Sequence, residues 1–231
     1  MPSWRFRIKI GTVPKVNISR IVLPEILDAL PQDSCAARCS RRDLRVINRL
    51  LGSAAWFRRV LQKYVRSDRR VLEVGAGTGE LGLAISSLGL GLAGLDLCRR
   101  PASWPYRATW FETDVLDFTG WGDYPIVIGN LFFHHFGRAA LEQLGFSLNE
   151  HARVIVASEP LRVQRTGRLF NLICPLIRAH PVTQYDGRVS IAAGFRHDEL
   201  PHLLRLNPAV WSWRVQETWL GNYRLVAERR S

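Results

Sequence analysis

The segment Val71-Leu-Glu-Val-Gly-Ala-Gly-Thr-Gly-Glu80 decides the fold class. Its apolar start is typical of a buried strand, and the glycines that follow indicate a tight turn into a helix. Closely spaced glycines let backbone N–H groups approach a ligand without obstruction by a Cβ atom. Gly75, Gly77 and Gly79 have the spacing G-x-G-x-G, which differs from the G-x-G-x-x-G of dinucleotide-binding folds.

Strand and helix patterns alternate along the chain after this loop. Further strands are expected within residues 91–97, 108–115, 124–133, 152–160, 211–219 and 222–230. Helices are expected within residues 78–89, 138–148 and 197–206, whereas residues 160–197 show no regular pattern. The last two strands are separated only by Leu220-Gly221 and indicate a hairpin. The sequence therefore predicts an α/β fold with a seven-stranded, mostly parallel sheet whose last strand is antiparallel.

The positive charge of the chain is concentrated at its N-terminal end. The 231 residues carry a formal net charge of +12, and residues 1–70 hold 16 Lys and Arg against 5 Asp and Glu. Residues 71–231 hold 16 against 15 and are nearly neutral. A basic segment favours nucleic acid or an anionic membrane surface, and the competing interpretation is a solvated arginine face on amphipathic helices.

We divide the chain into an N-terminal arm, a basic helical cap and a main domain. In the arm, residues 1–23, apolar and basic side chains alternate over residues 4–10, which suits an edge strand or a loose tail. In the cap, residues 24–66, helices are expected within 24–30, 41–52 and 54–65. Ser40 is the expected N-cap of the second helix, with Asp43 at its third position and Gly52 as its stop. The main domain is residues 67–231, with residues 158–197 as an insertion on the substrate side.

Composition also bears on location and metal chemistry. No stretch approaches the roughly 20 apolar residues of a membrane span, and charges interrupt the first 15 residues where a signal peptide needs an apolar run. We therefore expect a cytoplasmic protein. The four cysteines, Cys35, Cys39, Cys98 and Cys174, lack the paired spacing of a metal site and are expected to be reduced thiols, and no metal is expected.

The motif E-x-G-x-G-x-G that begins at Glu73 resembles that of the class I, Rossmann-like, S-adenosylmethionine-dependent methyltransferases. The resemblance covers residues 71–159 and, more loosely, the closing hairpin. Residues 40–52 and 194–201 also look like bacterial methyltransferases of small molecules. This resemblance implies S-adenosylmethionine as the cofactor.

The resemblance implies a role for each matching position. Asp96 would accept from the two ribose hydroxyls, because a carboxylate offers two acceptor oxygens to a vicinal diol. Asp114 would bind the adenine amino group, and Glu73 would orient the glycine loop or reach the ligand's ammonium group through water. Taken singly, Asp114 could instead be a turn former and Glu73 a surface carboxylate. The full set of expected cofactor residues is Glu73, Gly75, Ala76, Gly77, Gly79, Asp96, Leu97, Asp114, Val115, Asn130 and Leu131.

The acceptor side is read from the residues that follow the fourth strand. Asn130-Leu131-Phe132-Phe133 lacks both prolines of the D/N-P-P-Y/F/W sequence found in base-amine methyltransferases, which argues against that branch. His134 and His135 are more like branches that act on small molecules, where a histidine could deprotonate a phenol or enol. They could instead only pack beside the strand. On extended backbone the two would point apart, so at most one should face the pocket. Substrate contacts are expected from Phe132, Phe133, Glu159 and Arg162.

These observations predict an S-adenosylmethionine-dependent methyltransferase that methylates oxygen or carbon on a small hydrophobic or aromatic acceptor of the phenol, quinone or polyketide type. Two alternatives stay open. One is an RNA or protein methyltransferase that docks through the basic segment, and the other is a non-catalytic nucleic-acid-binding protein with the same fold. The expected partner is a small molecule, contact with a peripheral anionic surface stays open, and the sequence gives no oligomeric state.

Overall fold

The computed structural model describes residues 19–65, 70–105 and 107–230. The pattern within residues 4–10 and most of the arm lie outside the described residues. The helices are α1 (Ile26–Ala29), α2 (Cys35–Leu50), α3 (Ser53–Leu61), α4 (Glu80–Ile85), α5 (Arg138–His151), α6 (Gln164–Leu176), α7 (Pro181–Ala193) and α8 (Glu199–Leu203). The strands are β1 (Arg70–Val74), β2 (Gly91–Asp96), β3 (Thr109–Glu112), β4 (Ile126–Asn130), β5 (Val154–Pro160), β6 (Trp211–Glu217) and β7 (Asn222–Arg229). Three short 3₁₀ turns are η1 (Ser86–Leu88), η2 (Gly120–Asp123) and η3 (Phe133–His135).

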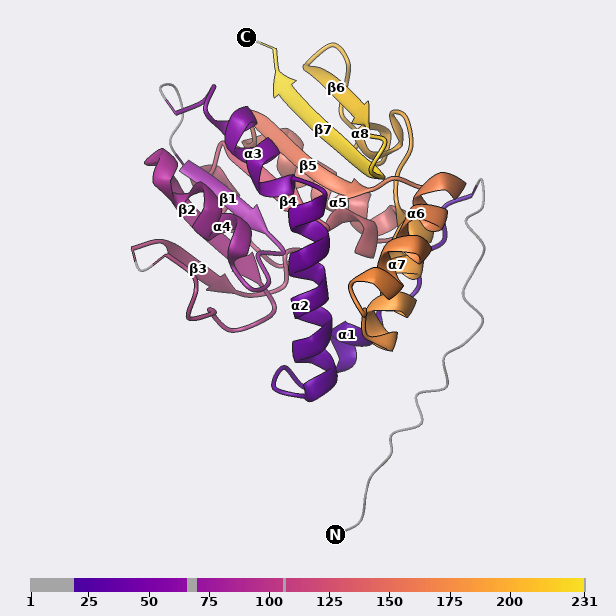
Figure 1. The fold of residues 1–231 in the computed structure, drawn as a ribbon. Helices are drawn as coiled ribbons and strands as arrows, with labels where there is room; N and C mark the ends of the chain where they lie inside the picture. Colours follow the sequence, from indigo (N-terminus) through magenta and orange to yellow (C-terminus); the bar gives the residue numbers. More distant parts are fainter. Residues whose placement is uncertain (1–18, 66–69, 106, 231) are drawn as a thin grey trace.

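The seven strands form one sheet in the order β3-β2-β1-β4-β5-β7-β6 (Figure 1). Strands β1 to β5 are parallel, and β7 pairs antiparallel with both β5 and β6. This confirms the predicted α/β sheet with an antiparallel last strand. The strand order reverses between β1 and β4, and ligands of open α/β sheets bind beside the carboxyl ends of the strands at such a point.

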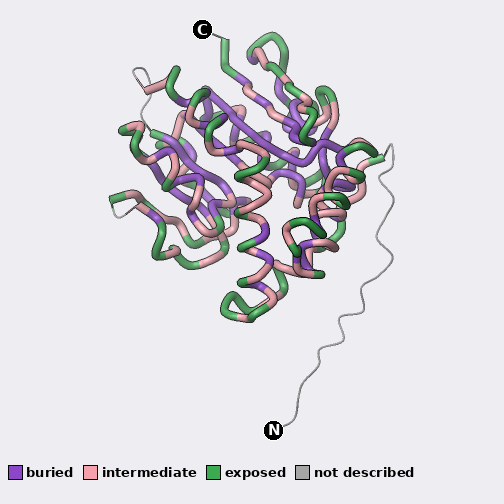
Figure 2. Tube along the Cα trace, in the orientation of Figure 1, coloured by how far each residue is buried: buried purple, intermediate pink, exposed green. Residues whose placement is uncertain are grey.

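Alternate residues of each parallel strand pack on opposite faces of the sheet. Leu72 and Val127 belong to the core beneath α5 and α8, whereas Val71 and Ile126 belong to the core beneath α3 and α4. Helices on both faces bury most of β1, β2, β4 and β5, as the buried path through the centre of the sheet shows in Figure 2, whereas the edge strand β3 is only partly buried. The sheet is therefore a fixed platform, and its carboxyl edge supports the loops of the site.

Helix α2 begins six residues earlier than the sequence predicted. Its N-cap is Ser34, whose hydroxyl accepts from the N–H of Ala37 at 3.2 Å, so the assignment of Ser40 as N-cap is wrong. Helix-forming Ala36, Ala37 and Arg38 extend the helix through the segment that was read as a connection. Ser40 is instead buried within the helix, where the Thr183 hydroxyl lies 3.1 Å from its own.

The segment that showed no regular pattern, residues 160–197, contains the helices α6 and α7. Glycine and proline hide the helical pattern there, since α6 contains Pro175 in its last turn and α7 begins at Pro181. Proline is tolerated at the first helical position because the N–H that it lacks has no partner in the helix there. The His180 ring caps α7 by accepting from the N–H of Val182 at 3.2 Å.

Among the described residues, no helix has the length and apolar character needed to cross a membrane.

Candidate active site

A cavity of about 840 Å³ lies at the carboxyl edge of the sheet. Its floor is formed by the glycine loop after β1, the ends of β2 and β4, and the loop after β3. Its walls are helices α1 and α2 on one side and α6 and α7 on the other, which flank the strand ends in Figure 1. The cavity therefore brings together segments from both ends of the chain.

The glycine loop lies against the cavity with backbone conformations that favour glycine. Gly75, Gly77 and Gly79 have φ values of 64°, 50° and 75°. A Cβ on Gly75 would lie 2.2 Å from the Phe132 ring, so the two residues pack directly. Beside Gly77 the space is open, because a Cβ there would meet nothing closer than 3.9 Å. The loop thus offers a ligand cradle at Gly77 that a side chain would fill.

Asp96 joins the end of β2 to this loop. Its Oδ2 accepts from the N–H of Gly77 at 2.7 Å, and its Oδ1 accepts from the N–H of Cys98 at 2.8 Å. The carboxylate lines the cavity, and the exposed side chain of Leu97 lines it next to Asp96. The predicted ribose-binding carboxylate is therefore fixed in position at the cradle.

Glu73 lies beneath the loop, on the face of the sheet that carries α4. Burial is the main cause that raises its pKa well above the ordinary value; the charge of Asp96 adds to it, and a hydrogen bond from the backbone of Gly82 opposes it. Within the described part of the chain, Oε2 of Glu73 has no hydrogen-bond partner. The structure thus makes Glu73 a buried group that lines the cavity, which differs from the surface carboxylate left open by the sequence.

The remaining predicted cofactor residues divide into two groups. Ala76, Asp114, Val115, Asn130 and Leu131 line the cavity, whereas Gly79 does not. Asp114 also closes its own turn, since its Oδ1 accepts from the N–H of Leu116 at 2.9 Å. Leu131 has a φ of 55°, a left-handed conformation that is costly for leucine and is held by a bond of 2.8 Å from its N–H to Ser158 O.

Two of the predicted substrate contacts, Glu159 and Arg162, are buried away from the cavity. Arg162 is 1% exposed, and its guanidinium pairs with Glu199 and donates to Gly194 O at 3.1 Å. Phe133 is also buried, packed below Gly129 in the core, so only Phe132 of the four lines the cavity. Glu159 and Arg162 looked like cleft anchors because both lie near the carboxyl end of β5, but their polar atoms satisfy backbone groups and charges inside the fold.

Glu159 holds the loop after β4 by its carboxylate. Oε1 accepts from the N–H groups of Phe132 and Phe133, each at 3.0 Å, and Oε2 lies 2.7 Å from Nδ1 of His134. Arg20 supports the same loop from outside, donating to the carbonyls of His134 at 2.9 Å and Phe136 at 2.8 Å. Burial lowers the pKa of Arg20 to about 10, so it remains a cation at neutral pH.

The ring of His134 lies between two carboxylates. Its Nδ1 faces Glu159, and its Nε2 lies 3.4 Å from Oε1 of Glu25, the residue that precedes α1. Burial alone would lower the pKa of His134, but the hydrogen bonds to Glu159 and Glu25 raise it to about 9. His134 therefore holds its proton at neutral pH, which does not suit the predicted role of a base.

His135 lies beside His134 and faces the same cavity. Their ring centroids are 4.2 Å apart, so the expectation that the two rings point in opposite directions is wrong. Residues 133–135 form the 3₁₀ turn η3, and such a turn does not alternate side chains as extended backbone does. Burial and the positive charge of His134 lower the pKa of His135, so a role as base stays a prediction for His135 alone.

Sequence reasoning missed the residues that the cap and α7 contribute to this centre. Glu25 accepts from the Ser190 hydroxyl of α7, and Asp28 Oδ2 lies 3.6 Å from His135 Nδ1. Asp186 accepts from the N–H groups of Ile26 at 2.7 Å and Leu27 at 2.9 Å, and burial raises its pKa to about 6. No local motif marks these positions, because they meet only when α1 packs on α7.

The other end of the cavity is apolar. Helix α2 and its C-cap line it with Leu44, Ile47, Leu50 and Leu51, and α6 lines it with Leu169, Phe170 and Ile173. The buried residues of α2 are Ala37, Ser40 and Asp43, none of which belongs to this row of apolar side chains. Leucine and isoleucine side chains of α2 are thus left to face the cavity.

Several arginines of the cap are engaged within the chain. Arg41 donates to Gln32 O at 2.6 Å, Arg58 donates to Ala84 O at 2.7 Å, and Arg45 lies 3.3 Å from Glu80. The described part of the basic segment therefore uses part of its charge to hold helix ends and loops.

Similar proteins were found by comparison of structures and not by comparison of sequences. No family model matches the chain, and no curated protein matches its sequence. The plantazolicin methyltransferase BpumL in complex with SAH (S-adenosylhomocysteine) has a TM-score of 0.68 and 12% identity, with 89% of this chain and 93% of that chain covered. The plantazolicin methyltransferase BamL, in complex with SAH and a triazolic desmethylPZN analog, has a TM-score of 0.60 and 13% identity, with 84% and 75% covered.

A third similar structure is the magnesium protoporphyrin IX methyltransferase ChlM from Synechocystis PCC 6803 with bound SAH. Its TM-score is 0.50 at 15% identity, and 89% of this chain and 91% of that chain are covered. At identities this low, the structural similarity shows that the three proteins and this chain have the same fold. The chain has the Rossmann-like fold of the class I S-adenosylmethionine-dependent methyltransferases, as the motif at Glu73 predicted.

Proposed function

We propose that the chain is a methyltransferase that binds S-adenosylmethionine at the glycine loop. The observation that carries this proposal is the pairing of Asp96 with the open cradle at Gly77, where the carboxylate is held 2.7 Å from the backbone N–H. Asn130 supports it, because its Oδ1 is buried at the cavity and has no partner among the described residues. Three similar structures are complexes of methyltransferases with SAH.

The residues fit the cofactor by their chemistry. A carboxylate at Asp96 suits a vicinal diol, and an amide oxygen at Asn130 suits a cationic ammonium. Val115 and Leu97 supply apolar surface beside these polar groups. When bound, the cofactor supplies a methyl group on a positively charged sulfur, which is already activated for displacement. The protein's part is then to align the acceptor and exclude water.

We further propose that the acceptor is a small hydrophobic or aromatic molecule methylated at oxygen or carbon. The apolar walls of α2 and α6 would hold its body, and the centre formed by His134 and His135 would lie at its reacting group. Phe132 packs on Gly75 and lines the cavity between these two regions, so its ring would separate cofactor from acceptor or stack on the acceptor. Such a cavity encloses a small molecule more readily than a nucleic-acid strand.

Calorimetric titration with SAH tests the cofactor site. The intact chain should bind SAH, and Asp96→Ala should weaken binding at least tenfold. Asp117→Ala serves as the matched control, because Asp117 lies three residues beyond Asp114 in the same loop and outside the cavity. Absence of heat at millimolar SAH, or equal affinity in the Asp96 and Asp117 variants, contradicts the proposal.

Binding to generic RNA over a salt series tests the alternative of an RNA methyltransferase. Several phosphate contacts should make affinity fall steeply, with a log-log slope of about −0.7 for each contact on a single strand. We expect a flat or absent response, because Arg41 and Arg58 of the cap already donate to carbonyl groups of the chain itself. A steep slope would favour the basic segment as a docking surface.

A further inference from the structure

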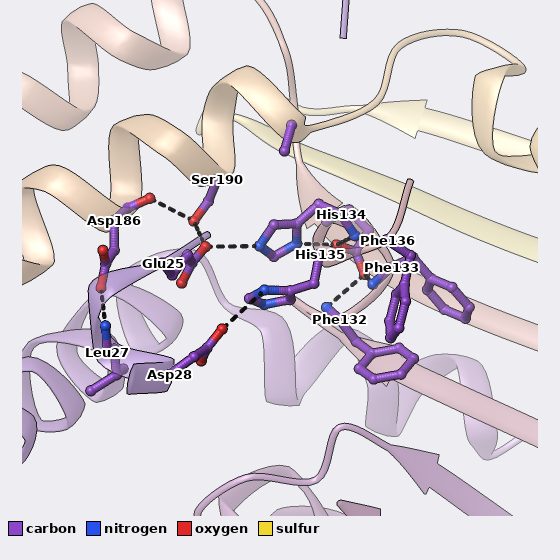
Figure 3. Close-up of polar contacts among 12 residues, drawn as sticks. Glu25, Leu27, Asp28, Phe132, Phe133, His134, His135, Phe136, Asp186 and Ser190 are labelled. Carbon is purple, nitrogen blue, oxygen red and sulfur yellow. Dashed lines mark hydrogen bonds and ion pairs between the residues drawn. The ribbon is translucent and has the colours of Figure 1, made fainter. Parts of the chain in front are cut away.

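We propose that Glu25, His134 and His135 bind a divalent transition-metal ion at the acceptor end of the cavity. The ligand atoms offered by these three residues lie within 4.8 Å of one another. The cysteine and histidine spacing gave no such indication, because Glu25 is more than 100 residues distant in sequence and the histidines were expected to diverge. Helix α1 and the turn η3 bring them together (Figure 3).

The distance between two of these ligand atoms suits a metal ion. His134 Nε2 and Glu25 Oε1 are 3.4 Å apart, which is longer than a usual N–H···O hydrogen bond. Two ligand atoms that each lie about 2.0–2.1 Å from a tetrahedral zinc ion are separated by roughly 3.3 Å. An ion can therefore take a place between the two atoms with little movement of either side chain.

Each candidate ligand is oriented by a second group. Glu159, which is fully buried, holds Nδ1 of His134 and so directs Nε2 toward Glu25. The Ser190 hydroxyl donates to Glu25, and Asp28 lies 3.6 Å from Nδ1 of His135. Partners that fix ligating histidines and carboxylates in this way are a general property of metal sites.

The charge around the centre also favours a cation. Three carboxylates, Glu25, Asp28 and Glu159, surround two imidazoles, and Arg20 is the guanidinium that reaches this loop among the described residues. Metal ligation requires both imidazoles to be neutral, so binding of the ion would release the proton of His134. With neutral imidazoles these groups sum to a net charge of −2. A divalent ion balances that charge, and nitrogen and carboxylate ligands together suit zinc or a neighbouring first-row metal.

Three protein ligands leave a fourth position, and all three residues line the cavity. An open position that faces a cavity is the arrangement of catalytic zinc sites, where the ion binds water or a substrate oxygen. If bound, the ion would favour the deprotonated form of an acceptor hydroxyl and so replace a histidine base in activating that oxygen. This last step rests on the proposed methyl transfer, whereas ion binding itself does not.

Equilibrium dialysis of the full-length, chelator-treated protein against ZnCl2 and CoCl2, without SAH, tests the site. We expect one ion per chain by atomic emission, and a visible Co²⁺ spectrum typical of four-coordination. Glu25→Gln and His135→Ala should each weaken binding at least tenfold. His135 is partly exposed, so His135→Ala should fold even if a variant of buried His134 does not, and thermal unfolding checks this.

His197→Ala is the matched control, because the exposed His197 lies 3.5 Å from the carboxylate of Glu217 outside the cavity. It should bind zinc like the intact chain. Binding of less than one ion per chain, or equal zinc affinity in Glu25→Gln, His135→Ala and His197→Ala, overturns the metal site. SAH titration of the same metal-free protein keeps the two proposals separate, since SAH binding without zinc binding defeats only the metal site.

Discussion

The carboxylate of Asp43 on α2 accepts a hydrogen bond of 2.9 Å from the hydroxyl of Thr183 on α7. The same oxygen accepts from the N–H of His180 at 2.7 Å, so one buried side chain joins the two walls of the cavity. Burial alone would raise the pKa of Asp43, but hydrogen bonds from His180, Arg42 and Thr183 together lower it. Asp43 is therefore a charged bridge between α2 and α7.

Removing this bridge should loosen the cavity walls. Asp43→Ala leaves Thr183 and the His180 N–H without their acceptor, and we expect a loss of roughly 2–4 kcal/mol in the free energy of unfolding. Ser40→Ala, which removes only the contact of 3.1 Å with Thr183, should cost about 1 kcal/mol. Urea unfolding measures the stability of both variants. Equal stability of the two would show that the Asp43 carboxylate does not stabilise the contact between α2 and α7.

The packing of Phe132 on Gly75 predicts an unequal effect of two glycine substitutions. Gly75→Ala places a Cβ 2.2 Å from the Phe132 ring, whereas a Cβ on Gly89 meets nothing within 4 Å. Both residues have positive φ, so Gly89→Ala reports backbone strain alone, about 1 kcal/mol. Gly75→Ala should lose more stability and also SAH affinity. Equal losses in thermal unfolding, with SAH binding intact, would contradict the close packing.

Burial of Glu73 predicts a pH effect on stability. Its pKa is raised in the folded chain, so the neutral form is favoured there, and stability falls as pH rises from the unfolded pKa toward the folded one. The slope over that window is about 1.4 kcal/mol per pH unit. Glu73→Gln removes this titration and should gain stability over the natural chain from pH 5 upward. If the difference in free energy of unfolding between Glu73→Gln and the natural chain stays the same from pH 4 to pH 8, Glu73 is not neutral in the folded chain.

Neighbouring positions on α6 separate the acceptor wall from the surface. Ile173 lines the cavity, and Leu172 is 65% exposed and does not line it. Ile173→Asp should weaken binding of the probe 2-naphthol at least fivefold, because a charge is costly in an apolar wall. Leu172→Asp should leave that affinity unchanged, and both variants should keep SAH affinity. Fluorescence titration reports the probe, and similar losses in both variants would place the apolar site elsewhere.

The sequence predicted the sheet well because its signals are local. Each buried strand has its own apolar run, and Gly75, Gly77 and Gly79 mark the turn without reference to distant residues. The carboxylate at Asp96 was found for the same reason, since it directly ends a strand. The sequence therefore predicted where the glycine loop and Asp96 lie, because both follow from the local pattern of residues.

The polar centre was not predictable in this way. Asp28 belongs to the four-residue helix α1 and Glu25 directly precedes it, and the importance of Glu25 follows from where α7 places Ser190. Arg162 was misjudged because nothing local shows that its guanidinium meets Glu199 inside the fold. Ser40 looked like a cap because arginines and an apolar periodicity follow it, while the real cap, Ser34, lies six residues earlier and is followed by Cys35 and two alanines.

The bridge between Asp43 and Thr183 spans 140 residues of sequence, and the bonds from Ile26 and Leu27 to Asp186 span 160 and 159. On the ribosome, α1 and α2 emerge long before the partner that holds them. The apolar side chains of α2 therefore stay exposed to solvent until the last third of the chain, which includes α7, is synthesised. A nascent chain stalled before residue 181 should carry a formed glycine loop but no closed cavity, and it should be a target for chaperones that recognise apolar helices.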